Sequence, residues 1–183
     1  MFNQFATPET QVQNAIGADV PLRWVGRPAQ GLLFRTGDLL MIPFSLLWGG
    51  FAIFWESTAI SDGGPIFFRL WGIPFVLIGL YMIAGRFIVD AYLRAHTTYA
   101  IGDHAIYFVR DGLANGVSTL AASALTPVQM QLGANGRGTI IFADSAIRFF
   151  NYSASWRMTT APDYAFESIP DVQKVYEMIN SIR

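Results

Sequence analysis

Two long runs of hydrophobic residues dominate the middle of the chain. The first extends from Leu39 to Trp55 and the second from Phe67 to Val89, with a polar stretch, Ser57 to Pro65, between them. The first run contains no charge, and the second carries charges only near its ends, at Arg69 and Arg86. A helix needs about 20 residues to span the hydrocarbon core of a bilayer. The pattern therefore predicts two transmembrane helices joined by a tight turn.

Small residues recur on one face of each predicted transmembrane helix. The first helix carries Ser45, Gly49 and Ala52, and the second carries Gly72 and Gly79. Small side chains allow the backbones of two membrane helices to approach closely. These five residues are therefore the candidate helix-packing residues of the hairpin.

After His96 the pattern changes from helical to extended. Short segments rich in β-branched and aromatic residues alternate with turn dipeptides such as Asn135-Gly136, which predicts antiparallel strands. The predicted strands lie near residues 97–101, 105–109, 125–132, 138–143 and 146–152. Another strand is predicted before the hairpin, in Pro21–Pro28. An amphipathic C-terminal helix is predicted with Pro170 and Asp171 in its first turn and hydrophobic residues at helical spacing from Val172 to Ile182.

The chain therefore divides into four parts. Residues 1–20 are expected to be a flexible N-terminal tail, with a short amphipathic helix as the alternative. Residues 21–36 hold the first β-strand and a membrane-proximal segment, and residues 37–94 form the transmembrane helical hairpin. Residues 95–183 form a cytoplasmic β domain with a C-terminal helix. The predicted fold class is a membrane α+β protein.

Basic residues predict the orientation of the hairpin. The flanks near the two chain ends carry more arginines than the turn does: Arg23, Arg27, Arg35, Arg86 and Arg94 against Arg69. Positive residues favour the cytoplasmic side. We expect a multi-pass protein of the bacterial inner (plasma) membrane with both termini cytoplasmic. Asp90 lies at i,i+4 spacing from both Arg86 and Arg94, which predicts helical ion pairs.

Composition narrows the range of functions. Only 14% of the 183 residues are charged and 52% are hydrophobic, whereas soluble domains average about 25% charged residues. The net charge of −1 does not indicate the excess of positive charge that is typical of nucleic-acid-binding proteins. The chain has no cysteine, which excludes disulfides, thiolate nucleophiles and cysteine-ligated zinc.

The order of several short motifs resembles bacterial membrane proteins of the pleckstrin-homology type (PH-like proteins). The motifs are Trp24-Val25-Gly26-Arg27-Pro28, Thr97-Thr98-Tyr99-Ala100-Ile101, Ile106-Tyr107, Gly138-Thr139-Ile140 and the segment Phe166 to Ile182. The resemblance implies a small sheet sandwich or open barrel closed by one C-terminal helix. It also implies that the strand before the hairpin joins the sheet formed after it. It carries over no functional residues.

No catalytic constellation is recognisable in the sequence. The two histidines, His96 and His104, have no cysteine or paired carboxylate nearby, so structural or solvated roles are favoured over a metal site. Gly133–Gly138 lacks the Lys-Ser/Thr pair of a phosphate-binding loop and is read as a hairpin turn. The prediction is therefore no catalytic residue, no metal and no cofactor. A weaker alternative places a cofactor ligand at His96, with a second ligand from another chain.

Aromatic and basic residues gather in one segment of the predicted β domain: Arg148, Phe149, Phe150, Tyr152, Trp156 and Arg157. Packing in the core or at a sheet edge is the favoured interpretation. The alternative is a surface that docks a partner protein, because Tyr, Trp and Arg are enriched at binding hot spots.

The predicted function is that of a non-enzymatic inner-membrane protein whose cytoplasmic PH-like domain mediates protein–protein interaction. Its expected partners are membrane lipids and an integral membrane protein or larger membrane complex. One alternative is a structural accessory subunit of a large respiratory or photosynthetic complex. Another is an enzyme with a membrane-surface site at His96.

Overall fold

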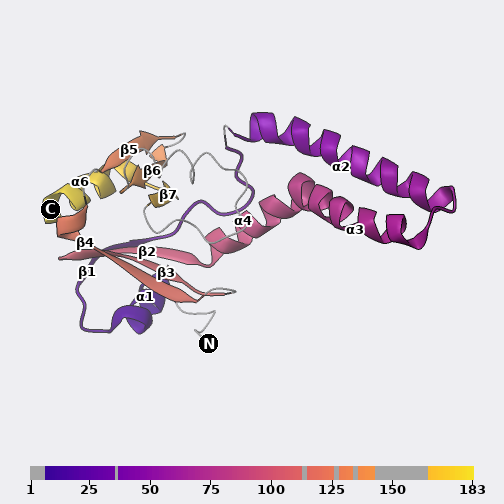
Figure 1. Cartoon of the computed structure of the whole chain (residues 1–183). Helices are drawn as coiled ribbons and strands as arrows, with labels where there is room; N and C mark the ends of the chain where they lie inside the picture. The colour runs from indigo at the N-terminus through magenta and orange to yellow at the C-terminus, as the bar shows by residue number, and fades with distance from the viewer. Residues whose placement is uncertain (1–6, 36, 113–114, 126–127, 134–135, 143–164) are drawn as a thin grey trace. The chain divides into compact units, whose positions relative to one another are not determined.

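The computed structural model describes residues 7–35, 37–112, 115–125, 128–133, 136–142 and 165–183, and it has an α+β architecture (Figure 1). The described residues form two compact units. One, the sheet unit, comprises the residues up to Gly31 and those from Ala91 onwards. The other, the hairpin unit, comprises Leu32–Asp90. The strand predicted at 146–152 lies outside the described residues.

The sheet unit contains a four-stranded antiparallel sheet in the order β1-β2-β3-β4. Its strands are β1 (Leu22–Gly26), β2 (Thr97–Gly102), β3 (Ala105–Arg110) and β4 (Gly116–Ala121). Val25 pairs with Ala100, and Gly26 pairs with Tyr99. The predicted pairing of the strand before the hairpin with the strand after it is therefore confirmed. The hairpin is a long insertion between two neighbouring strands.

A second antiparallel sheet has the order β5-β6-β7. It consists of β5 (Gln129–Leu132), β6 (Gly138–Ile141) and β7 (Ala165–Ile169), and helix α6 (Val172–Ile182) follows it. Gly136 has a φ of +70°, the left-handed conformation that the predicted turn between β5 and β6 requires. Both sheets are open in the described part of the chain.

The core of the sheet unit lies between the two sheets and α6. Tyr99 and Phe108 of the first sheet meet Phe166 of β7, with ring centroids 4.6 and 5.3 Å apart. Helix α6 contributes three fully buried side chains at helical spacing, Val172, Val175 and Ile179. The predicted amphipathic C-terminal helix is thus confirmed, with its apolar stripe in this core.

The expected flexible tail is wrong for Pro8–Ile16, which forms helix α1. The side chain of Thr7 accepts a hydrogen bond from the backbone N of Thr10 and caps the helix, and a proline occupies its first turn. Val12 is fully buried against Ala100 and Val109 of the first sheet. The short amphipathic helix, which was the alternative, is what this segment forms.

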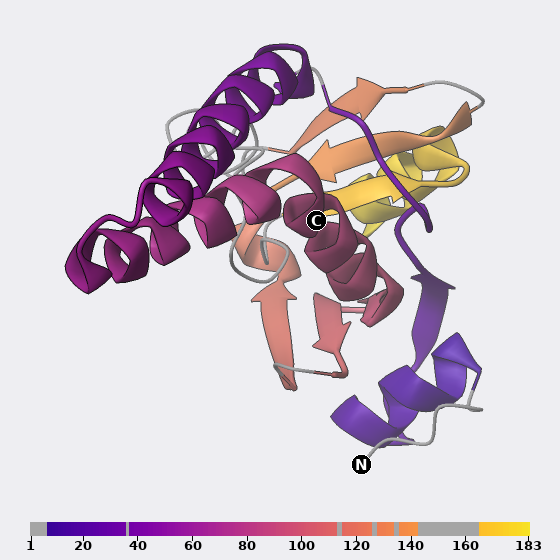
Figure 2. The same cartoon turned by 90° about the vertical axis from the view of Figure 1, so that its right-hand side faces the viewer.

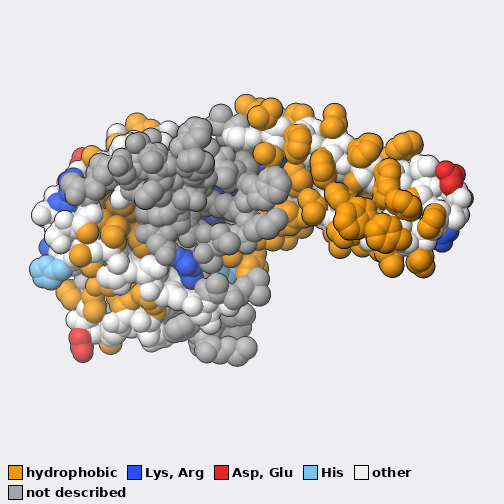
Figure 3. Space-filling view, in the orientation of Figure 1, with side chains coloured by type: hydrophobic (Ala, Val, Ile, Leu, Met, Phe, Trp, Pro, Cys, Tyr) orange, Lys and Arg blue, Asp and Glu red, His pale blue; other side chains and the backbone are white. Residues whose placement is uncertain are grey.

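The hairpin unit is built from helices α2 (Asp38–Ser61) and α3 (Ile66–Leu80), a π-helical segment (Tyr81–Gly85) and the start of α4 (Arg86–Ala95). Helices α2 and α3 lie side by side in both ribbon views (Figures 1 and 2). Among the described residues, two continuous helices, Asp38–Ser61 and Ile66–Ala95, are long and apolar enough to cross a membrane. Hydrophobic side chains cover the visible face of the hairpin (Figure 3).

Helix α2 continues past the predicted end at Trp55 to Ser61. The extra turns contain hydroxyl side chains that donate to carbonyls of the preceding turn. Ser57 and Thr58 donate to Phe54, and Ser61 donates to Ser57. These bonds satisfy the hydroxyls inside the helix, so the polar stretch remains helical where the sequence suggested a turn.

Deleting residues 1–28 should destabilise the sheet unit, because it removes α1 and the edge strand β1. We expect limited proteolysis in detergent to cleave the sheet unit of the 1–28 deletion at protease concentrations that leave the sheet unit of the unmodified chain intact. Deleting only residues 1–6 is the matched control, since it keeps α1 and its cap. Equal protease resistance of the 1–28 deletion would show that β1 is dispensable for the domain.

Candidate functional site

The two long helices touch where glycines face each other. A Cβ on Gly79 would lie 2.8 Å from the Cα of Gly49, which leaves no room for any larger residue without a shift of the backbones. All five predicted helix-packing residues are buried in the hairpin unit: Ser45, Gly49, Ala52, Gly72 and Gly79. The buried Ser45 hydroxyl donates to the carbonyl of Ile42. Its hydrogen-bonding requirement is therefore met within its own helix.

A buried ion pair joins the beginning of α2 to the beginning of α4. Arg86 Nη1 lies 2.6 Å from Asp38 Oδ1, and only 6% and 5% of the two side chains are exposed. Arg86 Nε also donates to the carbonyl of Met82, in the π-helical segment. The backbone N of Arg35 donates to Asp38 Oδ2. Both oxygens of this carboxylate are therefore hydrogen-bonded, as a buried charge requires.

Two ion pairs of this region join segments far apart in the chain, which helical spacing does not predict. Arg86 pairs with Asp38 on the opposing helix, and Asp90 accepts from Arg35 Nη2 at 2.8 Å. Arg94 is 1% exposed and donates to the backbone carbonyls of Ala29 and Gly31. Sequence reasoning missed these pairs because it counted neighbours along one helix only. The signal available was an acidic residue at one helix end and a basic residue at the other.

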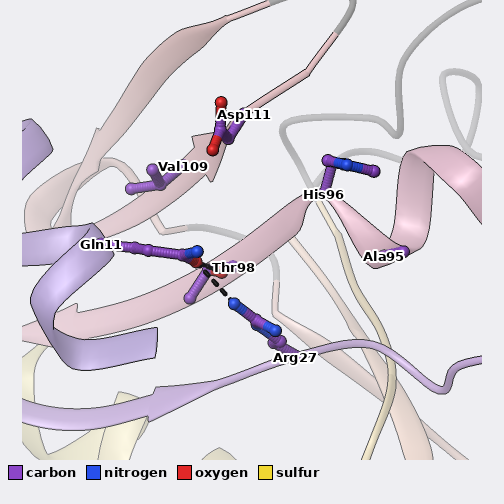
Figure 4. Close-up of a pocket in the computed structure, with 7 residues that line it drawn as sticks. All are labelled: Gln11, Arg27, Ala95, His96, Thr98, Val109 and Asp111. Atoms are coloured by element: carbon purple, nitrogen blue, oxygen red, sulfur yellow. Dashed lines mark hydrogen bonds between the residues drawn. The ribbon is translucent and has the colours of Figure 1, made fainter. Parts of the chain in front are cut away.

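A polar pocket opens on the α1 side of the first sheet (Figure 4). Its volume is about 260 Å³. It lies entirely within the sheet unit, and its lining comes from α1, the strands β2 and β3 and the segments that flank the strands. The lining residues are Gln11, Arg27, Ala95, His96, Thr98, Val109 and Asp111.

Gln11 holds one wall of the pocket in place. Its Oε1 accepts from Arg27 Nη2 at 2.6 Å and from the hydroxyl of Thr98 at 3.4 Å. The Nε atom of Arg27 is buried and has no hydrogen-bond partner in the part of the chain that the structure describes. A guanidinium presents several N–H donors in one plane, so Arg27 keeps donor capacity beyond its bond to Gln11.

His96 lies at the other side of the pocket. Its Nδ1 is 2.8 Å from the carbonyl oxygen of Tyr92, and its ring centroid is 4.1 Å from that of Tyr92. Because a carbonyl oxygen only accepts, Nδ1 is the donor of this hydrogen bond. The backbone N of Asp111 donates to the carbonyl of His96. The backbone carbonyl of His104 accepts from Ala122, outside the pocket.

Arg110 of β3 does not belong to the pocket. Arg110 alternates with Val109 and Asp111 along the chain, so it belongs to the opposite face of the sheet. Burial lowers the pKa of the Arg110 guanidinium, and Tyr99 opposes the shift electrostatically.

Among the described residues, no group of three or more His, Asp or Glu is placed to hold a metal ion. The candidate docking residues Arg148, Phe149, Phe150, Tyr152, Trp156 and Arg157 lie outside the described residues.

Comparisons of the chain with protein-family models, with curated proteins and with solved structures find no match. The two polar arrangements, the ion pairs of the hairpin and the pocket on the sheet, are therefore interpreted from their own geometry.

Replacing Gly79 by valine should separate the two long helices, because its first added carbon would meet the backbone of Gly49. Overpacking of a tight contact costs about 1–3 kcal/mol. We expect a lower apparent melting temperature of the detergent-solubilised chain. Gly50→Val is the matched control, since a Cβ at Gly50 meets no atom within 4 Å. Equal melting temperatures of the two variants would contradict a close contact at Gly79.

Replacing Arg86 by methionine should leave the buried Asp38 carboxylate without a charged partner and destabilise the hairpin by about 3–5 kcal/mol. Adding Asp38→Asn to that variant should restore part of the loss, because no uncompensated charge then remains. Reversible unfolding in mixed micelles of the unmodified chain, Arg86→Met, Asp38→Asn and the double variant would give the four free energies that are compared. Arg23→Gln breaks an exposed pair with Asp103 and should cost less than about 1 kcal/mol. Additive effects of the Arg86 and Asp38 substitutions would contradict direct pairing.

Proposed function

We propose that this chain is an integral protein of the bacterial inner membrane in which a non-catalytic PH-like domain is built around a two-helix transmembrane hairpin. The domain serves as a binding module for a partner protein at the membrane surface. The observation that carries the proposal is the insertion of two apolar helices between the paired strands β1 and β2. This connectivity attaches the sheet to the hairpin by two chain segments instead of one.

The exposed surface of the hairpin supports membrane insertion. Large hydrophobic side chains along α2 and α3 are more than half exposed, including Leu39, Leu47, Phe51, Phe54, Ile66, Phe67, Leu70, Trp71 and Leu77. Transferring one such side chain out of water is worth about 1.5–3 kcal/mol. A lipid environment would satisfy all of them together. The helices pair backbone N–H and C=O groups internally, as a lipid-facing segment requires, except where Pro43 and Pro74 remove a donor.

The polar contacts of the hairpin support the same proposal. Asp38 and Arg86 are buried against each other and hydrogen-bonded to backbone groups. An unpaired charge at membrane depth is costly, and paired charges at helix ends are tolerated. The flanking arginines favour a cytoplasmic location of both termini.

The contacts of Arg94 support the insertion of the hairpin between two paired strands. Its guanidinium binds the carbonyls of Ala29 and Gly31, and the side chain of Gln30 donates to the carbonyl of Arg94. These bonds tie the segment that leaves β1 to the helix that arrives at β2.

The alternative function, a structural accessory subunit of a large membrane complex, is favoured by one further observation. An apolar groove of about 200 Å³ lies on the hairpin between aromatic side chains of α2 and α3. It is lined by Trp48, Phe51, Ala52, Trp55, Trp71 and Phe75. A helix of a larger assembly would pack against such a surface by van der Waals contact.

Membrane fractionation tests the proposal. We expect the chain to stay in the membrane pellet after alkaline carbonate extraction and to be solubilised by mild detergent. Replacing Leu47 and Leu77 together by aspartate should move it to the soluble or aggregated fraction. Extraction of the unmodified chain by carbonate would refute membrane insertion.

Crosslinking in native membranes tests the binding role. Capture of one defined partner protein by the sheet unit is expected for a binding module, and a stoichiometric large assembly in mild detergent would favour the accessory subunit. A C-terminal reporter that is active only in the periplasm would refute the proposed orientation.

A further inference from the structure

We propose that the pocket beside α1 binds a small zwitterion, with its carboxylate at Arg27 and its ammonium group at Asp111. A short ω-amino acid is the class of ligand that fits this separation of charges. The inference rests on the sheet unit alone and is independent of membrane insertion.

Strand register places the two charged residues on one face of the sheet. Val25 pairs with Ala100, and Thr98 pairs with Val109. Since side chains alternate along a strand, Arg27, Thr98 and Val109 continue the row of Val25 and Ala100 on the face that α1 covers. Asp111 follows Val109 by two positions and belongs to the same face. The nine-residue helix α1 covers only part of this face, and the pocket occupies part of the rest.

The positions of these residues keep the opposite charges apart. Arg27 follows β1 and Asp111 follows β3, with β2 between them. Two strand spacings amount to about 10 Å. The two residues form no ion pair within 4.0 Å in the structure, and Figure 4 shows Gln11 and Thr98 between them. A cation and an anion held apart across one pocket match a ligand with complementary charges at its two ends.

Arg27 supplies the anion-binding end. Gln11 fixes the guanidinium through Nη2, while Nε is buried and has no partner among the described residues. The guanidinium lines the pocket, and guanidinium–carboxylate bonds are among the stronger hydrogen bonds in proteins. The hydroxyl of Thr98 shares the acceptor of Arg27 Nη2, the Oε1 of Gln11.

Asp111 supplies the other end. Its half-buried carboxylate accepts N–H donors. An ammonium group offers three donors and no acceptor, so it matches this carboxylate. A ligand with a carboxylate alone would meet repulsion from Asp111, and an amine alone would meet repulsion from Arg27.

The volume of the pocket limits the ligand to a small molecule. Drug-sized ligands occupy pockets of about 300–1,000 Å³, and this one has about 260 Å³. An α-amino acid carries both charges on one carbon, which is too short a separation for groups on β1 and β3. An ω-amino acid with about three methylene groups between its charged groups holds them further apart and comes closer to the roughly 10 Å that separates the strands.

Calorimetric titration of the full chain in lipid nanodiscs tests the proposal with three small probes: 4-aminobutyrate, which carries both charged groups, and butyrate and butylamine, which carry one each. We expect saturable binding of 4-aminobutyrate and at least tenfold weaker binding of the two singly charged probes. Arg27→Gln should weaken 4-aminobutyrate binding at least tenfold. Asp111→Asn should also weaken it and should reduce the preference for 4-aminobutyrate over butyrate, a change that a merely structural role would not produce.

Arg23→Gln is the matched control, since Arg23 lies in β1, is not among the residues that line the pocket, and pairs with Asp103. It should leave binding unchanged. If Arg27→Gln does not fold, the selectivity change in Asp111→Asn carries the test by itself. No saturable binding of 4-aminobutyrate, equal affinity for the three probes, or unchanged affinity in a folded Arg27→Gln variant would overturn the proposal.

Discussion

The structure depends on the pairing of β1 with β2. These strands are neighbours in the sheet although the whole hairpin separates them in the chain. Their hydrogen bonds bring together the two segments that lead to and from the helices. Arg94 adds bonds to the carbonyls of Ala29 and Gly31 just beyond β1. If this pairing were lost, α1 would lose part of the surface it covers, and Arg27 would no longer stand beside Thr98 in the pocket.

The main elements could be predicted because each has a strong local signal. The two apolar runs exceed the length that a soluble strand or turn would use, and the C-terminal helix shows its stripe at Val172, Val175 and Ile179. Helix boundaries were less predictable. Ser57 and Ser61 read as turn residues, yet in the structure their hydroxyls bond to the helix backbone. Helix α1 has a weak pattern, and burial of Val12 by the sheet decides its conformation.

The pocket could not be predicted from the sequence, because no local pattern joins its members. Gln11, Arg27, Thr98 and Asp111 come from four different segments, and only the strand register makes them neighbours. The same holds for Asp38 and Arg86, whose pairing depends on how two antiparallel helices align. Sequence spacing reveals partners along one helix or strand. Partners across elements require the register of those elements.

The insertion of the hairpin has a consequence for the order of folding. During synthesis β1 leaves the ribosome first, and its partner β2 follows only after both long helices have been made. The sheet therefore cannot close until the hairpin is complete, and β1 remains an unpaired edge during that interval. Once α2 and α3 are packed together, the ends of the long connection are already close, so much of the entropy cost of closing the loop has been met before the strands pair. Assembly of the hairpin is thus the step that makes the remaining fold kinetically accessible.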